Sequence, residues 1–106
     1  MRLAFFAPGN DPSTWLDGWH KAAGTAQRAA SAATRQAEWW SGGTAPLLDL
    51  QAACDPWRPR ETEDALRTEL GADRVTKVVI PDASHALFPE QPQAVVVAIV
   101  AWLRQL

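Results

Sequence analysis

Cysteine and histidine are scarce in this 106-residue chain, which has one cysteine, Cys54, and two histidines, His20 and His85. A single cysteine excludes a disulfide within the chain and any zinc site built on paired cysteines. The two histidines lie far apart in the sequence and lack the i,i+4 spacing of a helical metal pair. The sequence therefore predicts no metal, and no residue pattern argues for a nucleotide, a flavin or another cofactor.

A surplus of positive charge is also absent. Ten Lys and Arg residues stand against twelve Asp and Glu residues, so the formal net charge is −2. Such a balance leaves no electropositive face for a phosphate backbone. The longest apolar run, Ala94 to Leu103, is far shorter than the about 20 residues of a membrane span, and the N-terminal apolar stretch is too short for a secretory signal. We therefore predict a soluble cytoplasmic protein with neither nucleic acid nor membrane as a partner.

Tyrosine is missing, whereas tryptophan occurs six times. Four of these residues, Trp15, Trp19, Trp39 and Trp40, fall within the first forty positions. An indole ring needs apolar cover and a partner for its N–H group. This clustering predicts core positions for the tryptophans.

The chain divides into two segments of different character. In residues 1–44, small apolar residues recur at the helical period between His20 and Trp40. Near the start, Leu3–Ala7 fits either a strand or the end of a helix, and a dense turn signal follows it. We expect this first segment to be mainly helical and residues 45–106 to form an α/β unit.

The second segment follows the order strand, helix, strand, helix. The expected elements are a strand over Pro46–Ala53 that only Asp49 interrupts, a helix from Pro59 that Gly71 closes, a strand over Val75–Ile80, and a helix that Pro92 opens. This order predicts a short parallel βαβα unit. Because a two-stranded parallel sheet is not stable by itself, the unit resembles the end of a larger sheet. The wide apolar stripe of the last helix predicts packing on more than one side.

Two residues with catalytic side chains follow the two predicted strands. Asp55 lies in the segment Ala53-Cys54-Asp55-Pro56, and His85 ends the segment Ile80-Pro81-Asp82-Ala83-Ser84-His85. Sites in open α/β sheets form at the carboxyl ends of the strands, so an aspartate and a histidine there are expected to meet. The carboxylate then fixes the imidazole tautomer and supports the imidazolium. The alternative is a turn role for Asp55 before Pro56.

These two segments resemble the C-terminal part of the α/β-hydrolase superfamily. "PLLDLQAACDPWRP" is similar to the strand and loop that bear the acid, and "VTKVVIPDASHALFPEQP" to the last strand and the histidine loop. The resemblance implies a partial α/β-hydrolase fold over residues 45–106, with Asp55 as the acid and His85 as the base. It also implies that residues 1–44 are the end of a helical cap, in which the tryptophans have an acyl-chain pocket as an alternative role.

The nucleophile of that superfamily has no counterpart in the chain. No Gly-x-Ser-x-Gly pentapeptide surrounds any of the four serines, Ser13, Ser31, Ser41 and Ser84. Cys54 is a poor replacement because it adjoins the acid, and we expect it to be a small buried apolar residue. We expect Glu90, which precedes the last helix, to be an N-terminal helix carboxylate rather than a catalytic group.

Three hypotheses follow for the function. In the first, the chain is the C-terminal segment of an esterase-like α/β-hydrolase of Ser-His-Asp type, inactive alone, whose complete enzyme hydrolyses a small-molecule ester or a related acyl or C–X bond. In the second, it is a non-catalytic module that self-associates, or binds a protein partner, through its strand edge and last helix. In the third, the chain is a truncated gene product that begins at an internal methionine.

Overall fold

The computed structural model describes residues 5–106, which form two compact units. One unit combines residues 5–12 with residues 46–106, and the other is Ser13–Ala45. Residues 5–12, which were expected in the cap-like segment, thus belong with the α/β unit. Backbone hydrogen bonds explain this grouping, because the Ala86 N–H donates to the Phe5 carbonyl oxygen at 2.7 Å. The expected strand or helix end over Leu3–Ala7 lies partly outside the described residues.

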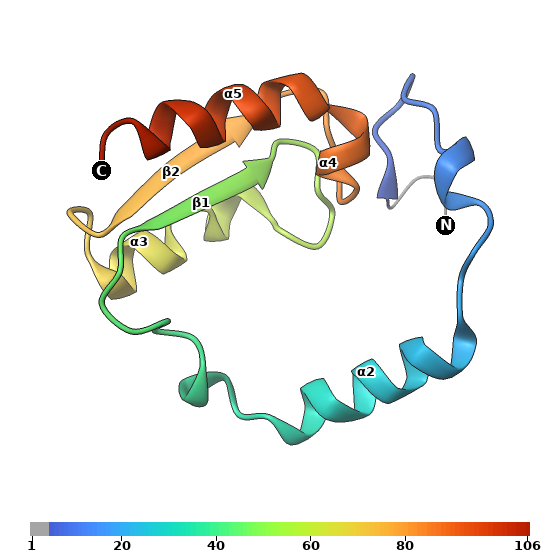
Figure 1. Cartoon of the computed structure of the whole chain (residues 1–106), viewed down its shortest axis with the longest axis horizontal. Helices are drawn as coiled ribbons and strands as arrows, with labels where there is room; N and C mark the ends of the chain where they lie inside the picture. Colours follow the sequence, from blue (N-terminus) through green and yellow to red (C-terminus); the bar gives the residue numbers. More distant parts are fainter. Residues whose placement is uncertain (1–4) are drawn as a thin grey trace. The chain divides into compact units, whose positions relative to one another are not determined.

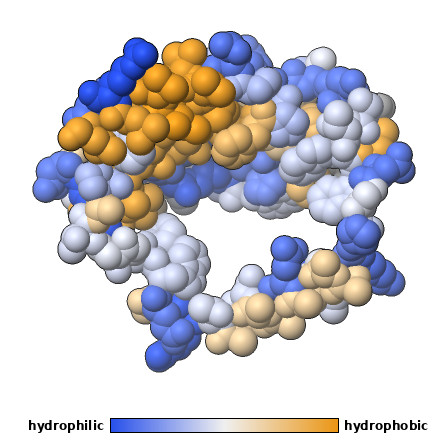
Figure 2. Space-filling view, in the orientation of Figure 1, coloured by the Kyte–Doolittle hydropathy of each residue, from blue (hydrophilic) through white to orange (hydrophobic). Residues whose placement is uncertain are grey.

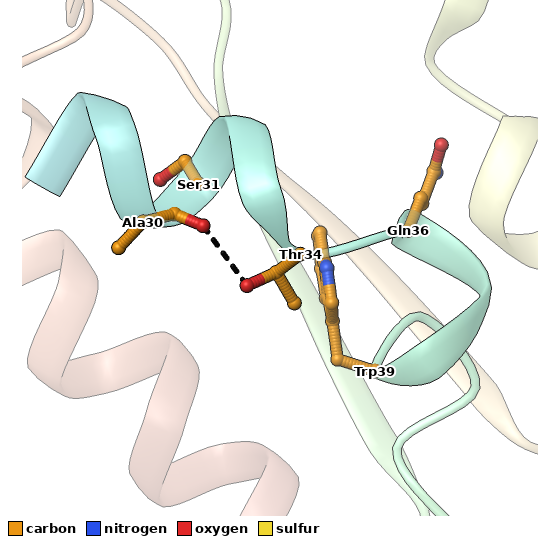
Figure 3. Close-up of a pocket in the computed structure, with 5 residues that line it drawn as sticks. All are labelled: Ala30, Ser31, Thr34, Gln36 and Trp39. Carbon is orange, nitrogen blue, oxygen red and sulfur yellow. Dashed lines mark hydrogen bonds between the residues drawn. The ribbon is translucent and has the colours of Figure 1, made fainter.

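The unit Ser13–Ala45 consists of one helix and two short 3-10 turns. Helix α2 (Lys21–Ala33) lies between η1 (Ser13–Trp15) and η2 (Gln36–Glu38). The predicted helix is confirmed, although it ends at Ala33 rather than near Trp40. The helix ends there because Thr34 has extended backbone angles. The Thr34 hydroxyl donates to the Ala30 carbonyl oxygen at 2.9 Å (Figure 3). Both residues line a pocket together with Ser31, Gln36 and Trp39.

The tryptophans of this unit are not core residues. Trp19 and Trp39 are more than half exposed, and helix α2 has no buried residue. The rings instead pair edge to face with sequence neighbours, Trp15 with Trp19 and Trp39 with Trp40. The prediction of core positions is therefore wrong for Trp19 and Trp39. A helix of small alanine side chains offers too little apolar area to cover an indole ring.

A two-stranded parallel sheet lies at the centre of the other unit (Figure 1). Strands β1 (Leu47–Ala52) and β2 (Val75–Ile80) pair in register from Leu47 opposite Val75 to Ala52 opposite Ile80. Turn η3 (Arg60–Thr62) and helix α3 (Ala65–Leu70) connect them, and helices α4 (Leu87–Glu90) and α5 (Pro92–Leu103) follow. The predicted order, the parallel pairing, the closing role of Gly71 and the start of the last helix at Pro92 are all confirmed. The expected helix start at Pro59 is wrong, because a 3-10 turn follows Pro59 and α3 begins at Ala65.

One face of the sheet is apolar and packs against α5. Side chains alternate along a strand, so Leu50 and Ala52 share this face with Val78 and Ile80. Ala52 and Ile80 are buried together with three residues of the following segment, namely Ala83, Leu87 and Val95. This small cluster is the apolar core that supports the loops after both strands.

The opposite face of the sheet has a polar network. Asp49 accepts hydrogen bonds from the Gln51 amide at 2.7 Å and from the Arg58 guanidinium at 3.1 Å. On β2, Lys77 pairs with Glu63 at 3.0 Å and with Asp64 at 2.7 Å. The hydrogen bond from Lys77 lowers the pKa of the exposed Asp64 carboxyl below its usual value. Asp49, which interrupts the apolar pattern of the strand, therefore has side-chain hydrogen-bond partners on the polar face of the sheet.

Helix α5 has an apolar surface that the described residues leave open. Val95 is buried against the sheet, whereas Val96, Val97, Val100 and Leu103 are exposed. The space-filling view shows hydrophobic surface over α5 (Figure 2). Within residues 5–106, α5 thus packs against the sheet and α4, and its other apolar side chains have no such cover. No helix in that range is long and apolar enough to cross a membrane.

Candidate functional site

The loops that follow β1 and β2 lie against each other. Directly after the strands, the Ala53 N–H donates to the Ile80 carbonyl oxygen at 2.9 Å, and the Cys54 N–H donates to the Ala83 carbonyl oxygen at 2.9 Å. These bonds extend the parallel pairing beyond the ends of the strands. Asp55 and His85, each in one of the two loops, are therefore delivered to the same edge of the sheet.

Asp55 and His85 form a hydrogen-bonded pair. The Nδ1 atom of His85 lies 3.0 Å from Oδ2 of Asp55, with the aspartate side chain 15% exposed and the histidine side chain 45% exposed. The other oxygen, Oδ1, accepts the Trp57 N–H at 2.9 Å. The turn role and the contact with histidine are thus both present, one on each carboxylate oxygen. Since Asp55 occupies Nδ1, Nε2 is the ring nitrogen left for proton transfer.

Two aromatic rings contact the imidazole. Trp57 lies edge to face with His85 at a centroid distance of 4.4 Å, and Phe5 does so at 5.5 Å. Phe5 and Trp57 also contact each other at 4.9 Å. The histidine ring is therefore oriented by a carboxylate on one nitrogen and by aromatic contacts around it, a combination that restricts its rotation.

Glu90 makes hydrogen bonds that sequence reasoning missed. Its carboxylate accepts the Ser84 N–H at 2.7 Å, the Asn10 side-chain amide at 2.8 Å and the Ala7 N–H. The expected role as an N-terminal carboxylate of the last helix is wrong, because Glu90 ends α4 and its partners lie in other segments. No local pattern announces this, since Ala7 and Asn10 are 83 and 80 positions away.

The turn before the histidine is also held in place. Asp82 has a positive φ of 52°, which non-glycine residues seldom adopt. Its carbonyl oxygen accepts the side-chain amides of Asn10 at 2.9 Å and Gln91 at 3.1 Å. Asn10 belongs to the N-terminal segment and Gln91 is the residue before α5, so hydrogen bonds from two different segments hold this turn.

Within residues 5–106, no serine or cysteine side chain stands beside the pair as the nucleophile that the α/β-hydrolase resemblance requires. Ser84 precedes His85, but this residue is only 1% exposed. Its hydroxyl donates to the Cys54 carbonyl oxygen at 3.2 Å. Cys54 is exposed with a free thiol, so the expectation of a buried cysteine is wrong. Its N–H is bound within the site, which gives this residue a structural part.

A pocket of about 260 Å³ adjoins the pair. It runs beside β1 and is bounded by polar and apolar side chains, namely Asp49, Leu50, Gln51, Ala52, Asp55, Arg58, Ser84, His85, Leu87 and Phe88. The Nε atom of Arg58 is buried without a hydrogen-bond partner. Within residues 5–106, no group of three His, Cys, Asp or Glu side chains is placed to hold a metal ion.

Comparisons with protein families, with curated proteins and with solved structures find no match for this chain. The functional argument therefore depends on the geometry of the site and on the chemistry of its residues.

Proposed function

We propose that Asp55 and His85 are the acid and the base of a hydrolase of the α/β-hydrolase type. The observation that supports this most directly is the contact of 3.0 Å between Nδ1 of His85 and Oδ2 of Asp55, at the carboxyl ends of two parallel strands. The bond that the complete enzyme hydrolyses is, in this proposal, an ester or a related acyl or C–X bond. The resemblance of both loops to that superfamily gives the same assignment.

The roles of the two residues follow from proton transfer. Oδ2 of Asp55 accepts a hydrogen bond from the Nδ1–H group of His85, so the neutral ring has its lone pair on Nε2. His85 then removes the proton of a nucleophilic hydroxyl as that oxygen attacks the substrate, and afterwards returns the proton to the leaving group. Asp55 stabilises the imidazolium that exists between these steps.

The attacking serine in this proposal is supplied by residues other than the four serines of the chain. Removing the nucleophile of a triad removes nearly all triad-dependent rate, even when the acid and the base remain. We therefore expect the isolated 106-residue chain to hydrolyse activated esters no faster than its His85→Ala variant.

A serine-directed fluorophosphonate probe tests the proposal on the native protein. The protein is enriched from its source cells with an antibody against the 106-residue chain, and both its intact mass and its labelling are measured. We expect a mass above 11.6 kDa and covalent labelling of one serine. Labelling should fall by about 10³-fold or more in a His85→Ala strain, because an unactivated serine is a weak nucleophile.

One control variant shows whether the effect is specific to His85. The His20→Ala variant removes the other histidine, which is exposed and lies in the other unit, and should leave labelling unchanged. The proposal is wrong if the native protein is not labelled, whatever its mass, or if labelling does not depend on His85.

A second candidate function is self-association through helix α5. The observation that favours it is the row of exposed apolar side chains on a helix with no charged residue between Pro92 and Leu103. Contiguous apolar surface of this kind often marks an interaction site.

Sedimentation velocity tests self-association. We expect the mean mass of the purified chain to rise with concentration, and Val97→Glu to return it to a monomer because a charge on the exposed face opposes burial. Gln93→Glu, at an exposed polar position of the same helix, is the matched control and should not change the association. A mass that stays at one chain at all concentrations contradicts this candidate.

A further inference from the structure

We propose that Glu90 is a positioning residue for His85, which it controls by holding the backbone on the N-terminal side of the histidine. This inference rests on the proposed function, because the position of His85 matters only if the ring transfers protons. Glu90 does not touch the imidazole. Its effect passes through Ser84, whose N–H is bound to the Oε2 atom of Glu90 at 2.7 Å.

The backbone around His85 is fixed from both sides. On one side, Ser84 is held by Glu90 through its N–H and by the Cys54 carbonyl oxygen through its hydroxyl. On the other side, the Ala86 N–H donates to the Phe5 carbonyl oxygen. The His85 side chain itself is 45% exposed and has a hydrogen bond to Asp55 as its polar contact. The main chain therefore sets where the ring begins, and Asp55, Trp57 and Phe5 can orient the ring only while that main chain holds it within their reach.

Glu90 also joins this loop to the N-terminal segment. Its Oε1 atom accepts the Ala7 N–H and the Asn10 side-chain amide, while Oε2 accepts the Ser84 N–H. Phe5, which contacts both His85 and Trp57, belongs to the same N-terminal segment. One carboxylate therefore couples the histidine loop to the aromatic ring that borders the imidazole.

A carboxylate is the group that this arrangement requires. All three partners are donors, and an ionised carboxylate has two acceptor oxygens and no proton. Glutamine has nearly the same shape but replaces one oxygen with an NH₂ group, so a donor then faces either Ser84 or the N-terminal segment. A part-buried donor left without an acceptor is costly. The change Glu90→Gln therefore removes the hydrogen bond to Ser84 or the bonds to the N-terminal segment, with little change in side-chain volume.

The tautomer of the His85 ring is the measurement that separates positioning from general stability. In the full chain at a pH where the ring is neutral, ¹⁵N-detected imidazole correlations show which nitrogen has the proton. We expect a proton on Nδ1 in the wild type, because Asp55 accepts it. In Glu90→Gln we expect loss of this preference, with the two ring nitrogens moving toward the averaged shifts of an unrestrained imidazole.

Two reference variants show the His85 tautomer without its Asp55 partner and after an unrelated substitution. Asp55→Ala removes the group that binds Nδ1 and supplies no amide in its place, so its His85 spectrum shows a ring without this partner. Glu61→Gln changes an exposed glutamate in η3 and should leave His85 unchanged. His20 serves as an internal reference, since it should not respond to any of these changes.

The possible results are distinct. If Glu90→Gln is folded, as judged by the methyl resonances of Val95, and its His85 tautomer equals that of the wild type, the inference is wrong. If Glu90→Gln does not fold, Asn10→Ala decides, because it removes one donor to Glu90 and the bond to the Asp82 carbonyl oxygen. A shift of the tautomer in that variant supports the inference, and an unchanged tautomer overturns it.

The test is independent of hydrolysis. A tautomer that depends on Glu90, together with absent probe labelling, refutes the proposed function but retains the positioning role of Glu90. Labelling that depends on His85, together with a tautomer that is unchanged in Glu90→Gln, supports the proposed function and refutes the positioning role of Glu90.

Discussion

Replacing Leu87 with alanine is expected to lower the free energy of unfolding by about 2–4 kcal/mol, the usual cost of removing a buried leucine side chain. Leu87 is 8% exposed and packs in the cluster formed by Ala52, Ile80, Ala83 and Val95. This cluster has few large side chains, so neighbouring residues have little freedom to fill the space. In a small domain a loss of this size is a large part of the total stability. Urea denaturation followed by circular dichroism measures it.

The adjacent residue is a close control for this prediction. Phe88 has a larger side chain but is 65% exposed. Phe88→Ala is therefore expected to change the free energy of unfolding by less than about 0.5 kcal/mol, the usual limit for a surface substitution. Equal losses for the two variants would contradict the burial pattern of the histidine loop.

Replacing Asp49 with alanine is expected to cost about 2–3 kcal/mol of unfolding free energy. Its side chain is 10% exposed and accepts hydrogen bonds from Arg58 and Gln51. Loss of one partner from a buried pair costs about 3–5 kcal/mol. We expect less here because Arg58 is 32% exposed and gains some solvation. Chemical denaturation of both proteins at neutral pH gives the difference.

The pair Arg35–Glu38 gives a contrast to Asp49. Both of its side chains are solvent-exposed, and an exposed ion pair contributes about 0–1 kcal/mol. We expect Glu38→Ala to lower the free energy of unfolding by an amount near the bottom of that range. Asp49→Asn, which keeps one acceptor oxygen, should fall between the wild type and Asp49→Ala. A cost for Asp49→Ala as small as that for Glu38→Ala would mean that the polar face of the sheet contributes little to stability.

Much of the α/β unit could be predicted from local patterns. The β-branched run Val75–Ile80 forms β2, Pro92 begins α5, and Gly71 with a positive φ of 98° ends α3. Each of these signals depends on the conformational preferences of a few consecutive residues. The meeting of Asp55 with His85 could also be predicted, because parallel strands that pair in register bring the loops after them together.

Other features follow from contacts between distant segments. Glu90 is bound to Ala7 and Asn10, 83 and 80 positions away. Asp49 pairs with Arg58, which is only nine positions away but lies in the loop after the strand. In the sequence, Glu90 has the position of a helix-capping acid and Asp49 that of a polar break in a strand. The exposure of Trp19 and Trp39 is of the same kind, because it depends on whether another element covers the ring.

The sequence by itself determined the order of strands and helices, the parallel pairing and the two loops that bear Asp55 and His85, because periodicity and turn chemistry act over a few residues. Only the tertiary structure decided which groups bind the Glu90 carboxylate, why Asp49 is stable within a strand, and where residues 5–12 belong. The Glu90 contacts and the place of residues 5–12 depend on hydrogen bonds between segments far apart in the chain. Asp49 depends on side chains two and nine positions away that the fold brings to it. A charged side chain has the same local pattern whether its partner is water or another group of the protein.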